Sequence, residues 1–219
     1  MGLFTPKAPV LIGVDISSTA VKLLQLSQTG GRYRVEHYAV EPLPPNAVVE
    51  KGIVEVEAVG DAIRRALARS GAKTRAAAAA VAGSAVITKI VPMQADLSEE
   101  DMEAQIQVEA NQYIPFALDE VNLDFQIIGP VPSSPEDVEV LIAASRKEKV
   151  EDRVAVAEGA GLKPLVMDVE SYAIQAAFEL VERQLPDGGK NKVIALVDVG
   201  EGPRRDRDVR MPTGDLMVG

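Results

Sequence analysis

The order in which strand-like and helical segments alternate is the feature that most constrains the fold of this chain. Nine segments are continuously apolar or rich in β-branched residues, as buried strands are, and they lie at 10–16, 21–27, 32–40, 76–83, 86–93, 121–128, 138–145, 163–169 and 192–199. Only short turns separate the first three, which predicts an antiparallel three-stranded meander. At 219 residues the chain is long enough to bury a substantial core.

Four amphipathic segments predict helices, and they lie at 56–71, 98–114, 145–161 and 168–185. Ser98 followed by Asp101, and Ser145 followed by Glu148, are typical of side chains that cap a helix start. The fourth helix has so many apolar positions that we expect it to be well buried, and residues 130–135 predict a hairpin loop. The predicted order is βββ–α–β–(β–α–β–β–α–β)–α–β. In this α/β fold the bracketed part, roughly 84–167, interrupts the surrounding framework.

The composition excludes several classes of function. A net charge of −10 argues against nucleic-acid binding, because a polyanion would be repelled. The chain has no cysteine, which excludes disulfides and thiolate metal sites. The one histidine, His37, lies in a predicted strand and is interpreted as a half-exposed strand residue. No apolar run approaches the roughly 18 residues of a membrane span, so we expect a cytoplasmic protein.

A polar turn between the first two strands is the first candidate site. Asp15 ends the apolar run, Ser17, Ser18 and Thr19 form the turn, and Lys22 follows in the next strand. Short hydroxyls and backbone amides in a tight turn are donors that a phosphate group uses. Asp15 could reach the Mg²⁺ of a bound nucleotide through water. Polar residues are also expected in ordinary turns whatever the function, so this motif alone favours an ordinary turn.

A second segment of the same kind favours the phosphate interpretation. Residues 193–200 again form an apolar run that ends in Asp198 and Gly200. Two strand–Asp–turn units around an insert resemble the actin/Hsp70/sugar-kinase ATPase fold. Within that fold, residues 111–125 and 167–180, together with the first turn, resemble the PilM family of type IV pilus assembly proteins, itself similar to FtsA. The resemblance covers residues 1 to about 200.

The resemblance implies a fold, a partner and a cofactor. Residues 1–83 and 166–200 would form actin-like subdomain 1A, and 84–165 an inserted 1C subdomain of the SHS2 kind. PilM-like proteins hold the N-terminal tail of the inner-membrane protein PilN in a groove between 1A and 1C, beside other pilus assembly proteins. They are cytoplasmic and associate with the membrane through these partners. ATP with Mg²⁺ would bind at the two phosphate motifs, to which Asp15, Ser17, Ser18, Thr19, Lys22, Asp198 and Gly200 correspond.

Two departures from the family pattern affect these expectations. Ser17 stands where the superfamily often has glycine. After Gly200 the sequence continues with Glu201, which adds negative charge, and Pro203, which lacks a backbone donor. Residues 201–219 lack apolar periodicity and predict a disordered tail. We therefore expect a truncated or frame-shifted chain that lacks the second lobe and binds ATP weakly or not at all.

Two other interpretations of function stay open at the sequence level. The first is a phosphotransferase of the sugar- or acetate-kinase type on the same fold, although the insert offers no convincing substrate base. Glu170 is a conceivable water-orienting residue, but a capping or surface carboxylate near a helix start is the favoured interpretation. The second is a non-functional fragment. The sequence favours a nucleotide-binding scaffold without catalytic residues over an enzyme.

Overall fold

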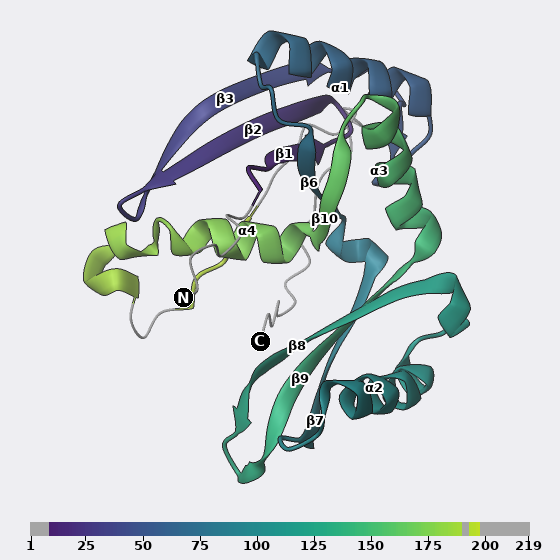
Figure 1. Cartoon of the computed structure of the whole chain (residues 1–219), viewed down its shortest axis with the longest axis vertical. Helices are drawn as coiled ribbons and strands as arrows, with labels where there is room; N and C mark the ends of the chain where they lie inside the picture. The colour runs from purple at the N-terminus through teal and green to yellow at the C-terminus, as the bar shows by residue number, and fades with distance from the viewer. Residues whose placement is uncertain (1–8, 190–192, 198–219) are drawn as a thin grey trace, which may run out of the picture.

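The computed structural model describes residues 9–189 and 193–197, and it arranges them around two main sheets (Figure 1). The first sheet has five strands in the order β10-β6-β1-β2-β3. The strands are β1 (Ile12–Ile16), β2 (Ala20–Thr29), β3 (Arg32–Pro42), β6 (Ala76–Val81) and β10 (Lys163–Val169). β1, β2 and β3 form the predicted antiparallel meander, whereas β6 pairs in parallel with both β1 and β10.

One face of this sheet is covered by two helices, α1 (Val56–Ser70) and α3 (Lys147–Gly159). Alternating side chains of the strands point to this face, so Ile12, Val14, Val21 and Leu23 join one core with α1 and α3. The start of α1 at Val56 and its end at a left-handed Gly71 agree with the sequence prediction. This core is the largest of the three buried apolar clusters within the described residues.

Strand β6 of the first sheet, which lies between β10 and β1, consists of five alanines followed by Val81. Alanine has a low intrinsic preference for strands, so the strand is imposed by its two neighbours rather than by its own side chains. Helix α4 (Glu170–Glu179) follows β10 directly and lies on the face opposite α1 (Figure 1). The methyl groups of β6 leave room for helices on both faces.

The second sheet is antiparallel, with the order β7-β9-β8, and it carries one helix on one face (Figure 1). Its elements are β7 (Val86–Gln94), α2 (Glu99–Tyr113), β8 (Val121–Val131) and β9 (Ser134–Arg146). Met102, Ile106 and Ala110 of α2 are buried against the sheet, as the predicted apolar stripe requires. Ser98 accepts a hydrogen bond from the Asp101 amide, which confirms the predicted cap.

The chain returns to the first sheet earlier than expected. We predicted an inserted unit that extends to residue 165, but α3 contributes Val156, Ala157 and Ala160 to the core of the first sheet. The second sheet ends at Arg146. The predicted cap at Ser145 is wrong, because Ser145 belongs to β9 and its hydroxyl donates to the Ala85 carbonyl (3.1 Å). The N-cap of α3 is Arg146, without a side-chain cap hydrogen bond.

Two predictions for the C-terminal part differ from the structure. We expected the helix at 168–185 to be well buried, but α4 ends at Glu179 and has no buried residue, because nothing in the described part of the chain covers its outer face. Residues 193–197 carry no strand, and Val193 and Val197 are strongly exposed. The strand predicted at 192–199 is therefore not formed over these five residues, and its other residues lie outside the described ones.

Small elements complete the fold, and one of them lies beside the candidate site. The strands β4 (Val48–Val49) and β5 (Gly52–Ile53) form a two-residue hairpin. The short 3₁₀ helices are η1 (Gly83–Ala85), η2 (Leu118–Glu120), η3 (Glu182–Gln184) and η4 (Pro186–Gly189). Among the helices that the structure describes, none is both long and apolar enough to cross a membrane.

Candidate functional site

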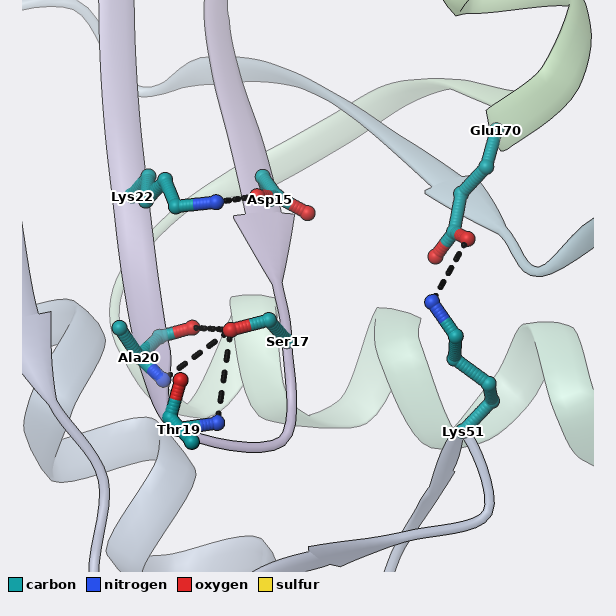
Figure 2. A network of polar contacts seen from close by, with 7 residues as sticks. All are labelled: Asp15, Ser17, Thr19, Ala20, Lys22, Lys51 and Glu170. Carbon is teal, nitrogen blue, oxygen red and sulfur yellow. Dashed lines mark hydrogen bonds and ion pairs between the residues drawn. The ribbon is translucent and has the colours of Figure 1, made fainter. Parts of the chain in front are cut away.

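The turn between β1 and β2 is closed by the side chain of Ser17 (Figure 2). Its hydroxyl donates to the Ala20 carbonyl (2.9 Å) and accepts from the amides of Thr19 (3.4 Å) and Ala20 (3.1 Å). Ser17 is not among the described residues with a positive φ, so the backbone does not require glycine here. The departure from the superfamily pattern at this position is therefore accommodated, because serine both fits the turn and stabilises it.

Asp15 and Lys22 face each other across β1 and β2 next to this turn. They are direct cross-strand partners, and the Lys22 ammonium lies 2.8 Å from the Asp15 carboxylate. Both side chains are about half exposed, on the face of the sheet opposite α1. An exposed pair of this kind contributes little to stability.

A second ion pair, absent from our sequence predictions, lies beside the turn (Figure 2). Lys51, in the β4–β5 hairpin, lies 3.3 Å from the carboxylate of Glu170 at the start of α4. Behind it, Arg153 of α3 is almost fully buried, with 3% of its surface exposed. Arg153 donates to the backbone carbonyls of Lys51 (3.2 Å) and Lys149 (3.4 Å).

Arg153 connects the two ion pairs electrostatically. Burial lowers the pKa of its guanidinium, whereas the carboxylates of Glu170, Asp152 and Asp15 raise it. Both Asp15 at the first turn and Glu170 at the start of α4 therefore act on the same buried cation. The cluster combines three cationic side chains, from β2, the β4–β5 hairpin and α3, around the end of β1.

These residues fit a phosphate group through side chains rather than through the turn amides. The amides of Thr19 and Ala20 already donate to Ser17, so they are engaged within the turn. Lys22 and Lys51 bring positive charge to the turn, and half-exposed Asp15 can hold a nucleotide's Mg²⁺ through water. Ser18 lies in the same turn. Asp198 and Gly200, predicted for the second phosphate motif, lie outside the described residues.

A hollow of about 390 Å³ lies between the β4–β5 hairpin, the start of α3 and the second sheet. Its apolar wall comes from Ile87, Ile114, Pro115, Phe116, Val121 and Ala144, and its rim carries the basic residues Lys51, Arg146 and Lys149 beside Glu50. The Arg146 guanidinium lies over the Phe116 ring, 5.2 Å from its centre. We call this the hairpin hollow.

A second hollow, of about 550 Å³, lies between β8 and β10. Both are edge strands of their sheets, and the hollow also reaches Tyr172 of α4. Segment 111–125, which carries the family resemblance, supplies residues to both hollows. Within the described part of the chain, no group of three or more His, Cys, Asp or Glu could hold a metal ion directly.

The comparisons with known proteins identify the family. A family model described as type IV pilus assembly protein PilM matches residues 13–204. This chain belongs to the PilM family. The family predicted from the first turn and segment 111–125 is thereby confirmed.

A solved structure of a PilM–PilN type IV pilus biogenesis complex is similar to this member of the PilM family. The identity is 30%, the TM-score is 0.71, and the match covers 83% of this chain and 53% of that chain. This PilM-family chain thus spans about half the length of the chain it matches. The match also confirms the predicted actin-like α/β fold class. The cytoplasmic domain of EpsL, an inner-membrane component of the type II secretion system of Vibrio cholerae, matches at 13% identity and a TM-score of 0.47, over 73% of this chain and 57% of that domain.

Sequence reasoning found the first turn of this PilM-family chain but missed Lys51, Arg153 and the role of Ser17. Lys51 lies in a segment without a motif, and its partner Glu170 is 119 residues away. Arg153 lies within an amphipathic helix, where a basic residue is normally expected on the surface. One feature could have indicated Lys51. Glu50 and Lys51 form a two-residue hairpin loop, where asparagine and glycine are favoured, so two charged residues are unusual there.

Proposed function

We propose that this chain is an adaptor of type IV pilus biogenesis that docks the N-terminal tail of PilN. The observation that supports it best is the similarity, at 30% identity over 83% of this chain, to the PilM–PilN complex. Through that partner the adaptor is held at the cytoplasmic face of the inner membrane, beside other pilus assembly proteins. Residues 86–146 act as the 1C subdomain, and the first sheet with α1, α3 and α4 acts as 1A.

The hairpin hollow is the docking site in this proposal. Its apolar wall of Ile87, Ile114 and Phe116 suits apolar side chains of an extended tail. Its basic rim of Arg146 and Lys149 suits the carbonyl oxygens and any acidic group of that tail. The apolar wall and Arg146 belong to 1C, whereas Lys149 and the β4–β5 hairpin lie outside it, so a bound tail would contact both 1C and α3 of 1A.

Titration of a fluorescently labelled PilN N-terminal peptide tests the docking. We expect Phe116→Ala to raise the Kd about 10-fold or more, because a buried aromatic anchor contributes most of the energy of such interfaces. Tyr38→Ala, which removes an exposed aromatic on the first sheet, serves as the matched control and should leave the Kd unchanged. Absence of peptide binding by a folded chain would contradict the proposal. If Phe125→Ala raises the Kd and Phe116→Ala does not, the tail docks in the second hollow instead.

We further propose that the turn around Ser17 binds the phosphates of Mg-ATP, weakly in this chain. Asp15 would hold the Mg²⁺ through water, and Lys22 would pair with a phosphate oxygen. Isothermal titration of Mg-ATP against the whole chain should show weak binding that Asp15→Asn and Lys22→Met reduce further. Sub-micromolar affinity would contradict the expected weakness, and equal affinity of both variants would contradict the site.

A further inference from the structure

The turn of the β4–β5 hairpin has an unfavourable backbone conformation. Val49 pairs with Gly52, so Glu50 and Lys51 form a two-residue loop, with φ angles of 49° and 66°. Such turns favour asparagine and glycine, because longer L side chains rarely adopt a left-handed conformation. Non-glycine residues in this conformation persist where surrounding contacts hold them, and they are frequent in ligand clamps and switches.

Two contacts hold this turn, and they differ in character. On the backbone side, buried Arg153 donates to the Lys51 carbonyl (3.2 Å). On the side-chain side, the half-exposed Lys51 ammonium lies 3.3 Å from one oxygen of Glu170. The first contact is shielded from water and the second is not. The side-chain contact is therefore the one that a soluble ligand can replace.

The same turn belongs to two sites at once. Glu50, Lys51 and Gly52 line the hairpin hollow. The Lys51 side chain also points toward Glu170, beside the Ser17 turn and the Asp15–Lys22 pair (Figure 2). A change of partner at Lys51 therefore acts on the wall of the hollow.

We propose that Lys51 is a further anion-binding residue, which exchanges Glu170 for a phosphate oxygen of a polyphosphate ligand and thereby couples that ligand to the hairpin hollow. A triphosphate carries several negative charges against the single charge of Glu170, so it competes well for an exposed ammonium. When the Lys51 side chain leaves Glu170, the strained turn changes conformation while Arg153 still holds the Lys51 carbonyl. This inference rests on the proposed binding of a phosphate ligand at the Ser17 turn.

The first experiment measures a change in the hairpin hollow by fluorescence and needs no peptide. The chain has no cysteine, so Ser84→Cys, at an exposed position in the lining of the hollow, takes one environment-sensitive fluorophore. We expect millimolar Mg-ATP to change the fluorescence of the labelled full chain, and tripolyphosphate with Mg²⁺ to do the same, because the phosphates are the recognised part. No response to either ligand would overturn the inference.

Two substitutions should act in opposite directions. Lys51→Met removes the ammonium, so the ligand concentration at half-response should rise about 5-fold or more, or the response should disappear. Glu170→Gln removes the competing charge, so the half-response concentration should fall several-fold. A purely structural role of the pair would move both variants in the same direction, and that result would overturn the inference.

The matched control removes one positive charge elsewhere. Lys163 begins β10 at the end of the sheet away from the Ser17 turn, where it pairs with Ala76. Lys163→Met should respond to the ligand as the unmodified chain does. A loss of response equal to that of Lys51→Met would mean that net charge, not the exchange at Lys51, carries the effect, and would overturn the inference.

The second experiment separates this inference from the docking proposal. Mg-ATP should change the Kd of the labelled PilN peptide about 5-fold or more in the unmodified chain and leave it unchanged in Lys51→Met. If the peptide does not bind, the docking proposal fails while the fluorescence experiment still decides the coupling. A Kd that responds to Mg-ATP equally in both chains would overturn the coupling and leave the docking intact.

Discussion

The two faces of the first sheet differ more than any other two regions of the molecule. On one face α1 buries six residues, whereas α4 on the opposite face buries none; the six are Val59, Gly60, Ala62, Ile63, Ala66 and Leu67. Neighbouring residues of β2 show the same contrast, since Leu23 is 0% exposed and Leu24 is 42% exposed. Both faces of the sheet carry apolar residues, so the faces differ in burial because of what covers them.

The covered face of the first sheet stabilises the fold, whereas the open face carries the proposed ligand-binding side chains. Val14, Val21 and Leu23 point to the covered face, whereas Asp15 and Lys22 point to the open one. A strand has a period of two, so one β1–β2 pair supplies both sets without conflict. Stability and binding can therefore be altered independently by substitutions one residue apart.

The largest expected effect is a pair of substitutions in β2. Leu23→Ala should lower the free energy of unfolding by about 2–5 kcal/mol, because it leaves a cavity in the main core. Leu24→Ala should lower it by less than about 1 kcal/mol, since this side chain is already partly in water. Urea denaturation followed by circular dichroism measures both. Similar losses would show that the open face contributes to the core.

A smaller effect is expected from the buried carboxylate of the covered face, Glu41. The hydrogen bond from Arg69 (2.5 Å) chiefly lowers the pKa of Glu41, and Arg65 adds to this, whereas burial opposes it. The lowered pKa means that the stabilisation is complete above the ordinary glutamate pKa and is lost as the pH falls through the folded-state value.

Glu41→Gln should therefore reduce stability at pH 7 and weaken the fall in stability between neutral and acidic pH. Urea midpoints measured from pH 7 downward test this. Arg69→Met should weaken the same pH dependence, and the double variant should add little to either single change. Additive losses would mean that the two side chains do not act as a pair.

The ends of α1 and α4 sharpen the comparison further. α1 ends at Gly71 with φ 68°, whereas α4 ends at Leu180 with an ordinary right-handed backbone. Gly71→Ala should cost about 1 kcal/mol through the backbone alone, because a methyl group would meet only His37 at 4.0 Å. Gly60→Ala, within the same helix, is the control and should not destabilise the chain, since its nearest neighbours lie at 3.8 Å.

The smallest effect on stability is expected on the open face. Lys22→Met breaks the exposed pair with Asp15 and should change the free energy of unfolding by less than about 1 kcal/mol. The same variant should weaken binding of Mg-ATP. A large loss of stability from Lys22→Met, as measured by urea denaturation, would contradict the separation of the two faces.

The strands and helices were largely predictable from the sequence because their periodicity is local. The meander, α1, the hairpin loop and the cap at Ser98 all depend on residues close together in the chain. The burial of α4 was not predictable, because its apolar residues resemble those of α1 and only the tertiary structure decides what covers them. The Lys51–Glu170 pair was not predictable for the same reason. The whole second sheet lies between the two residues in the sequence, so only the tertiary structure brings them together.

The alanine strand β6 has a consequence for how the chain folds. Alanine has no rotamers to lose, so ordering β6 costs backbone entropy only, but its methyl groups also bring little driving force for collapse. Its partners, β1 and β10, lie far away along the chain on either side. Parallel pairing of such distant segments forms slowly, so β6 and β10 should join this sheet late, templated by the meander and by the packing of α1.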